Sequence, residues 1–239
     1  MLPFFALAHA APVDLLEGTW ALEMHAVSAA RVAVFGDVRS VTRTAVLVRV
    51  ERDGDGWVHD HRTCGSSIEG GPLVRTRIPA AYFDAVRPKR LAPSVEVDAD
   101  TGTPRYRVDL ERFAGGWDPS ACERVPSEAD DPCVRDWDGD GKPGITIEVK
   151  APLLPWAEVY VAQQTHPRLD GHLVSPDLIA GRLRVGELDN RVLGASSPLF
   201  HATPDVRSVD AASTFRMERV EDGASCADVL ELTGIADAP

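Results

Sequence analysis

Most of this sequence consists of short segments in which apolar or β-branched residues alternate with polar ones. Turns rich in Gly, Pro and Asp separate these segments, and this pattern is typical of strands whose two faces meet different environments. It predicts about ten strands. They fall at 20–27, 41–50, 57–64, 74–78, 95–97, 106–110, 145–149, 157–164, 171–174, 178–188 and 214–220.

Helical patterns are sparse and cover only 79–86 and 227–232. Many short strands joined by regular turns favour an all-β fold, and we expect a single β-barrel or β-sandwich with one or two short helices. No internal repeat or low-complexity linker marks a boundary. Residues 11–239 are therefore expected to form a single β-rich domain.

The charge balance limits the classes of partner. The 239 residues carry a formal net charge of −12, and the sequence pI is about 5.0. Nucleic acids and anionic membranes attract basic surfaces, so neither is an expected partner. After the N-terminal segment no apolar run approaches the length of a membrane helix, and we expect no membrane insertion.

The first residues resemble the second half of a secretory signal. An apolar run over 2–10 ends in Ala-x-Ala, which predicts cleavage after Ala10 and makes 1–10 the remnant of a signal peptide, although a positively charged start is absent. A short apolar strand is the alternative. Export would place the protein in the periplasm or outside the cell.

The four cysteines are expected to form disulfides if the protein is exported, because an even number of cysteines in an oxidising compartment usually pairs in this way. Three pairings are open. Cys122 and Cys133 bracket a short segment rich in Pro and acidic residues, which favours a local bridge and leaves Cys64 to pair with Cys226.

Residues 136–144 read Asp-Trp-Asp-Gly-Asp-Gly-Lys-Pro-Gly and carry the clearest chemistry of the chain. Asp136, Asp138 and Asp140 alternate on a glycine-rich backbone, so their carboxylates can point inward around a hard cation. The sequence predicts a structural calcium site here. A solvated acidic turn is the alternative.

The D-x-D-G-D-G-x-P-G pattern resembles the calcium loops of thrombospondin type 3, dockerin and integrin-type propeller repeats, and the first half of an EF-hand loop. The resemblance covers about a dozen residues and implies three carboxylate ligands, a backbone ligand from the Lys142 carbonyl and a sharp turn at Gly141. Gly144 and Ile147 stand where those families often place an acid. Further ligands are then expected from elsewhere, with Asp130, Asp131 and Glu148 as candidates.

A near-copy occurs at 53–56, which reads Asp-Gly-Asp-Gly between two predicted strands. Asp-Gly between strands is a hairpin signal, and we interpret this copy as a turn without an ion.

Gly18-Thr19-Trp20 opens the first predicted strand, and Arg216 and Arg219 lie in the last one. This arrangement resembles the lipocalin and broader calycin pattern, in which a G-x-W packs under an Arg. A guanidinium stacked on an indole would close one end of a barrel.

Two further patterns allow site hypotheses. His59 and His61 share one face of a strand and would bind a transition metal if a third ligand came from a neighbour; exposure on an edge strand is the alternative. Trp117, Trp137 and Trp156 fall in or near loops, where an indole either binds a sugar or an apolar ligand or closes a barrel end. Neither a nucleophile elbow nor a phosphate-binding loop occurs.

These observations favour a secreted, non-enzymatic binding or cell-surface protein with a structural calcium loop, whose partner is a small apolar molecule or a cell-surface component. A secreted polysaccharide hydrolase with carboxylate catalysis is the alternative, since the sequence contains 37 acidic residues. A purely structural envelope protein is a third.

Overall fold

The computed structural model describes residues 12–32, 36–70, 75–151 and 155–235. The strands are β1 (Gly18–Val32), β2 (Gly36–Asp53), β3 (Gly56–Glu69), β4 (Arg75–Arg77), β5 (Lys89–Leu91), β6 (Ser94–Val97), β7 (Pro104–Asp109), β8 (Phe113–Gly115), β9 (Ile145–Lys150), β10 (Ala157–Thr165), β11 (Arg168–Ser175), β12 (Leu178–Arg184), β13 (Asp189–Ala195), β14 (Asp205–Ser208) and β15 (Thr214–Val220). The helices are α1 (Ala80–Ala85) and α2 (Cys226–Thr233), with short 3₁₀ turns η1 (Pro12–Leu16), η2 (Pro198–Phe200) and η3 (Asp210–Ala212).

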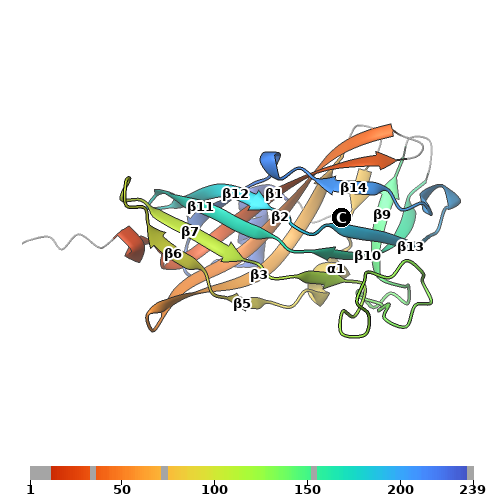
Figure 1. Ribbon diagram of the computed structural model, residues 1–239, viewed down its shortest axis with the longest axis horizontal. Coiled ribbons are helices and arrows are strands. Elements are labelled where there is room, and N and C mark those ends of the chain that lie inside the picture. Colours follow the sequence, from red (N-terminus) through yellow and green to blue (C-terminus); the bar gives the residue numbers. More distant parts are fainter. Residues whose placement is uncertain (1–11, 33–35, 71–74, 152–154, 236–239) are drawn as a thin grey trace, which may run out of the picture.

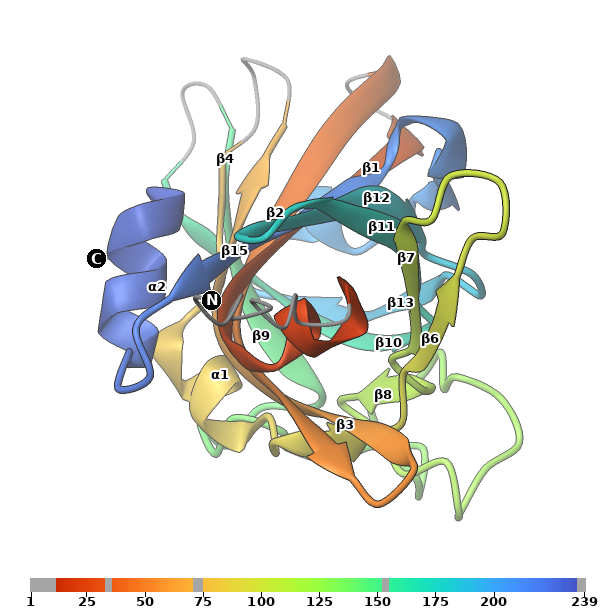
Figure 2. The same cartoon turned by 90° about the vertical axis from the view of Figure 1, so that its left-hand side faces the viewer.

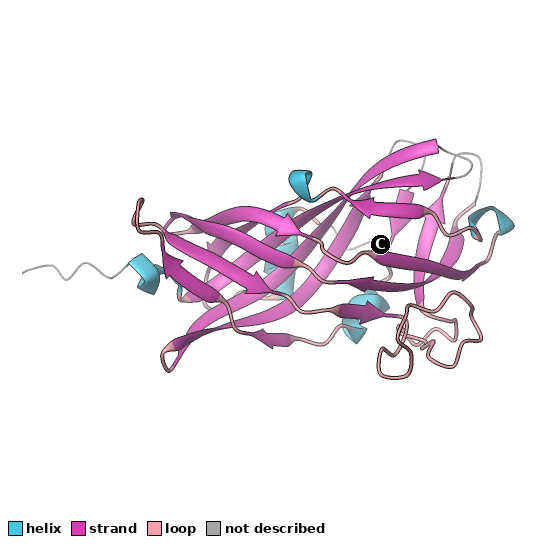
Figure 3. Ribbon diagram, viewed as in Figure 1, coloured by secondary structure: helices cyan, strands magenta, loops and turns pink. Residues whose placement is uncertain are grey.

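All these strands belong to one antiparallel sheet (Figures 1 and 3). Its order is β13-β10-β9-β4-β3-β2-β1-β15-β12-β11-β7-β6, with β14, β5 and β8 attached to β1, β3 and β10. The sheet curls on itself into a half-barrel, and η1 lies across one end of it (Figure 2). The expected all-β class with few short helices is confirmed. A single curled sheet corresponds to the barrel-type alternative, not to a sandwich of two packed sheets.

The strand pattern of the sequence is confirmed for the long strands and incomplete for the short ones. β5, β8, β13 and β14 were not expected as separate strands, and the run expected over 178–188 ends at Arg184. Each missed strand has three to seven residues and is defined by pairing with a longer partner, as β5 pairs with β3. Local alternation carries little information at that length.

Both expected helices are present. Pro79 is the N-cap of α1, and α2 begins with a capping box in which Ser225 and Asp228 satisfy each other's backbone N–H groups. Gly234 ends α2 in the left-handed region at φ 63°. α2 lies on the convex side of β1–β3, where Val229 and Ile235 pack against Ala21 and Ala45.

Both expected disulfides are present. Cys64 bridges to Cys226 and ties α2 to β3, and Cys122 bridges to Cys133 within the loop that follows β8. Two disulfides indicate an oxidising environment, extracellular or periplasmic. The segment expected to be a signal remnant lies outside the described residues. No helix in the described part of the chain is long and apolar enough to cross a membrane.

The expected contact between the first and last strands involves Arg219. Its guanidinium carbon lies 4.3 Å from the centroid of the Trp20 ring, and its Nη1 donates to the Glu17 carbonyl at 2.8 Å. Trp20 Nε1 donates to the Leu16 carbonyl at 3.0 Å, which ties η1 to β1. Gly18 has φ 138°, a conformation that favours glycine, and a side chain there would also displace the guanidinium from Trp20.

Candidate metal centre

The acidic loop lies between β8 and β9 and is closed at its base by backbone hydrogen bonds. The Trp137 N–H donates to the Gly144 carbonyl at 2.9 Å, and the Gly144 N–H donates to the Arg135 carbonyl at 3.0 Å. Gly139 and Gly141 have φ values of 73° and 81°, which few residues except glycine adopt. The loop therefore forms a closed turn with the Asp side chains inside its curve.

The carboxylates of Asp136, Asp138 and Asp140 converge. One oxygen from each lies within 4.8 Å of the others, although the three residues are half-buried or exposed. Asp136 accepts the N–H groups of Gly139 and Gly141 at 2.8 and 2.9 Å. These bonds fix the loop and leave carboxylate oxygens facing one another, which is the donor set that Ca²⁺ prefers.

Asp138 carries the most direct sign that a cation belongs here. Its Oδ2 accepts the Thr146 N–H at 3.0 Å, whereas its Oδ1 is buried and has no hydrogen-bond partner among the described residues. Burial raises the pKa of Asp138, the Thr146 N–H opposes this, and the negative charges of Asp140 and Asp136 add to the rise. An unpartnered buried carboxylate oxygen costs free energy that a bound cation would recover.

Two of the acids expected to complete the site, Glu148 and Asp131, have other contacts. Glu148 faces Arg77, with 3.4 Å between its Oε2 and Arg77 Nη1. Lys142 donates its own N–H to Asp140 Oδ1 at 2.8 Å. Within the described residues, the side-chain cluster thus consists of three aspartates, and a bound ion would take its remaining ligands from backbone carbonyls or water.

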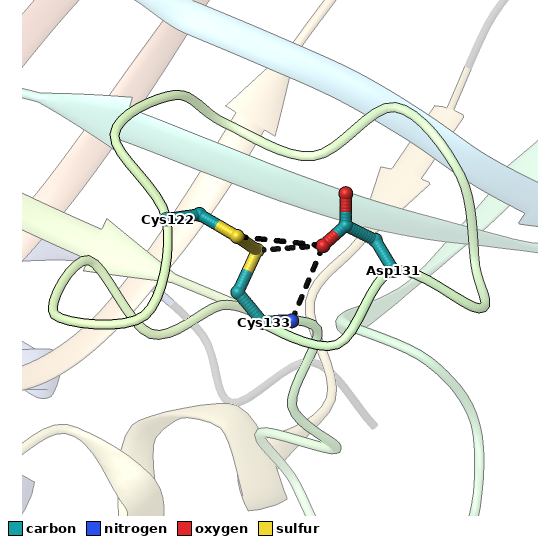
Figure 4. Close-up of side chains that lie close together, drawn as sticks. All are labelled: Cys122, Asp131 and Cys133. Carbon is teal, nitrogen blue, oxygen red and sulfur yellow. Dashed lines mark hydrogen bonds between the residues drawn. A yellow bond between two sulfur atoms is a disulfide. The ribbon is translucent and has the colours of Figure 1, made fainter.

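Asp131 belongs to the neighbouring disulfide loop, not to the acidic cluster. Its Oδ1 accepts the Cys133 N–H at 3.2 Å and lies 3.4 and 3.0 Å from the sulfurs of Cys122 and Cys133 (Figure 4). The two sulfurs are joined to each other, so they are not free thiolate ligands for a metal. The disulfide instead stabilises the chain just before Asp136.

The near-copy at 53–56 forms the expected hairpin. Asp53 pairs with Gly56 at the end of β2 and β3, and Gly54 has φ 61°. The exposed Asp53 carboxylate faces Arg90 at 3.3 Å. Asp55 thus gives a matched control for experiments on the acidic loop.

His59 and His61 lie on the concave face of β3, so the alternative of exposure on an edge strand is wrong. β3 pairs with β2 on one side and with β5 on the other, and the two side chains are 0% and 9% exposed. His59 Nδ1 lies 2.6 Å from the Tyr106 hydroxyl and its Nε2 lies 3.2 Å from His61 Nδ1. Among the described residues, no third His, Cys or acid joins the pair, so the structure offers no third side-chain ligand for a transition metal at this position.

Both histidines are held neutral by their surroundings. Burial lowers the pKa of His61 to about 4, with a further contribution from the charge of Lys89. The pKa of His59 is also well below its usual range, because of burial and of His61. The Tyr106 hydroxyl was not foreseen as their partner, since it lies 47 residues further along the chain.

The three loop tryptophans differ in exposure. Trp117 is 3% exposed and donates its ring N–H to the Gln163 carbonyl at 3.1 Å. Trp137 is half-buried, and its ring packs edge-on against Phe113. Trp156 is 40% exposed, so it alone among them presents a large part of its indole to solvent.

The concave face of the half-barrel changes along its length. Near η1, Trp20, Leu22 and Tyr106 are fully buried and belong to one large core cluster. Beyond them the same face of β1–β3 carries half-buried hydroxyl side chains that pair across strands, Ser28 with Ser40 at 2.9 Å and Thr44 with Ser66 at 3.2 Å. The end near η1 is therefore filled, and the distant end is lined by small polar groups.

A polar cleft of about 380 Å³ lies between the disulfide loop and the β10–β13 edge. Its lining consists of Glu123, Arg124, Val125, Ser127, Gln164, Asp189 and Arg191. The two acids share this cleft with two arginines. This polar setting differs from the apolar pocket that typically holds a catalytic carboxylic acid.

In comparisons with protein families, with curated proteins and with solved structures, nothing matched this chain.

Proposed function

We propose that this chain is an exported, non-enzymatic binding protein whose acidic loop holds a structural calcium ion. The observation that supports the metal is the convergence of three carboxylates around the buried, unpartnered Oδ1 of Asp138. Calcium at this position would neutralise the repulsion among the three acids and hold the start of β9 through Thr146. Its role would be to stabilise the fold.

Isothermal titration calorimetry of the full chain with CaCl₂ tests the metal. The wild type should bind one calcium, and Asp138→Asn should abolish binding while keeping the shape of the side chain. Asp55→Asn removes one charge from the hairpin of the near-copy and should leave binding unchanged. Absence of a calcium signal in the wild type would refute the site, and equal losses in both variants would show only a general charge effect.

The proposal of a bound ligand rests on the difference between the two ends of the concave face. The filled core near η1 gives no support for an internal ligand at that end, because Trp20 and Tyr106 are fully buried there. The distant half combines hydroxyl groups with apolar side chains such as Met24 and Ile68, all half-buried. Such a mixed surface suits a small amphiphilic or apolar molecule.

A fluorescent naphthalene sulfonate dye tests this face. Thr42→Phe adds a ring on the concave side, because Thr42 pairs with Ala26 and Ile68 in register. Arg39→Phe adds the same ring at an exposed position of the same strand. Dye binding that Thr42→Phe removes and Arg39→Phe keeps would support a ligand site, whereas an equal response to both substitutions would contradict it.

The hydrolase alternative has no comparable support in the described residues. The cleft described above holds Glu123 and Asp189 among arginines, without an apolar setting. It stays a prediction of the sequence.

A further inference from the structure

The convex face of β4, β9 and β10 carries an unusual group of side chains. Register pairs Arg75 with Lys150 and Arg77 with Glu148, and residues paired across a ladder share one face of the sheet. Trp156 comes directly before Ala157, which pairs with Val149, so Trp156 falls opposite Lys150 on that same face. We call these five residues the Trp156 face.

The indole is the centre of this group. The guanidinium carbon of Arg77 lies 4.9 Å from the centroid of the Trp156 ring, and Lys150 Nζ lies 5.8 Å from it. These cations hold the ring in place while 40% of the residue stays exposed. A large aromatic side chain that is both fixed and exposed is typical of a binding surface.

The charge of the Trp156 face is opposite to that of the whole protein. It has three cations, Arg75, Arg77 and Lys150, against Glu148 and the Glu158 that pairs with it in register, on a chain with a formal net charge of −12. Among the described residues, Glu148 is the acid that faces one of these cations closely, at 3.4 Å from Arg77, and both side chains are about one third exposed. The local excess of positive charge would attract an anionic partner at short range.

A second aromatic and cation pair continues the line along β10. Tyr160 lies four residues after Trp156, so it is on the same face at a distance of about 13 Å, taking 3.3 Å per strand residue. Lys142 Nζ lies 5.9 Å from the Tyr160 ring, and the Tyr160 hydroxyl donates to Glu158 at 2.7 Å. Aromatic rings and cations therefore repeat along this face, with an acid between them, and Tyr160 is half-buried against Trp117 and its neighbours whereas Trp156 is exposed.

We propose that the Trp156 face, extended to Tyr160, binds an anionic polysaccharide. Sugar rings would stack on the two aromatic rings, their carboxylate or sulfate groups would pair with Arg75 and Lys150, and their hydroxyls would bond to the intervening acids. A linear polymer can follow this row, whereas a flat anionic membrane would press Glu148 and Glu158 against its own charge. The inference is independent of the concave ligand site, and it meets the acidic loop only at Lys142.

Fluorescence anisotropy of labelled polygalacturonate tests the proposal on the full chain, with neutral dextran as the uncharged polymer. Trp156→Ala should weaken binding about tenfold, the size of one aromatic contact of about 1.4 kcal/mol. The double change Arg75→Gln and Lys150→Gln should weaken it about as much and should flatten its dependence on salt. Arg39→Gln, an exposed cation on β2, should change the affinity less than about twofold.

The measurement is made in calcium and in chelator, since an acidic polymer can also be bridged through a bound ion. Binding that persists in chelator and is lost in Trp156→Ala supports the Trp156 face. The proposal is overturned if polygalacturonate does not bind, if Arg39→Gln weakens it as much as the double change, or if the wild type prefers vesicles of phosphatidylglycerol over the polymer. Melting curves of each variant exclude loss of fold as the cause.

Discussion

The buried histidine pair makes acid sensitivity a direct consequence of the fold. At neutral pH, His59 and His61 are uncharged and join Tyr106 in one chain of contacts, 2.6 and 3.2 Å long. Protonating either ring would place a charge in the core beside Lys89, whose ammonium donates to the Leu110 carbonyl at 2.7 Å. We expect the protein to lose stability as the pH falls, and His61→Gln to remove part of that loss.

The magnitude follows from the pKa of His61. Its folded-state pKa is about 4, against 6.5 for an unperturbed histidine, and 1.36 kcal/mol per pKa unit makes the complete difference worth about 3 kcal/mol. Because the folded pKa is the lower one, the unfolded chain takes up the proton first. The free energy of unfolding is therefore unaffected above pH 6.5 and falls between pH 6.5 and about 4. About 2.5 kcal/mol is lost between pH 7.5 and 4.5.

Urea unfolding followed by tryptophan fluorescence measures this at pH 7.5 and 4.5. Other groups titrate over the same range, so the informative quantity is the difference in pH dependence between the wild type and His61→Gln. The wild type should lose about 2.5 kcal/mol more than the variant. His172→Gln changes an exposed histidine on β11 and serves as the control.

Equal pH dependence in the wild type and His61→Gln would refute the argument, because it would mean that His61 titrates alike in both states. If the wild type gained stability relative to the variant on acidification, the pH dependence would have the opposite sign to the one predicted. That result would mean that the core histidine is charged in the folded state. A control variant that behaves like His61→Gln would assign the effect to general charge instead.

Three further perturbations test other parts of the fold. Replacing Cys64 and Cys226 by Ser should lower the free energy of unfolding by about 5 kcal/mol in the chain-entropy model, since the bridge spans 162 residues; unchanged denaturation midpoints would contradict this. Arg219→Lys should lower the free energy of unfolding by about 2 kcal/mol, because the stacking on Trp20 and the carbonyl hydrogen bonds are lost. Arg216→Lys, at an exposed position beside Glu218, is the control and should leave that free energy nearly unchanged. Asp138→Asn should raise the melting temperature in chelator, because it removes a buried charge, and lower it in calcium; equal shifts in both conditions would exclude an ion there.

Some of this molecule could be predicted from local sequence. The alternation of residues identified the long strands, and the short spacing of Cys122 and Cys133 identified their bridge. The hairpin at Asp53 followed from turn chemistry alone. These features depend on residues that are close in the chain, where the physical preferences act without knowledge of the fold.

Features that depend on register could not be predicted in the same way. The sequence offered Arg216 and Arg219 equally, and only the pairing of β15 with β1 places Arg219 over Trp20. Tyr106 meets His59 because the sheet curls, which no spacing in the chain reveals. Strands as short as β5 form only because a longer strand provides hydrogen-bond partners.

The measurement that tests the calcium site most directly is the melting temperature of the protein by scanning calorimetry, in excess calcium and in chelator. At a free calcium concentration about a hundred times the dissociation constant, binding stabilises the native state by about 2.7 kcal/mol, or about 5 °C for a chain of this size. We predict this rise for the wild type and for Asp55→Asn, and its absence for Asp138→Asn. Wild-type curves that coincide in calcium and chelator would contradict the site and leave residues 136–144 as a solvated turn.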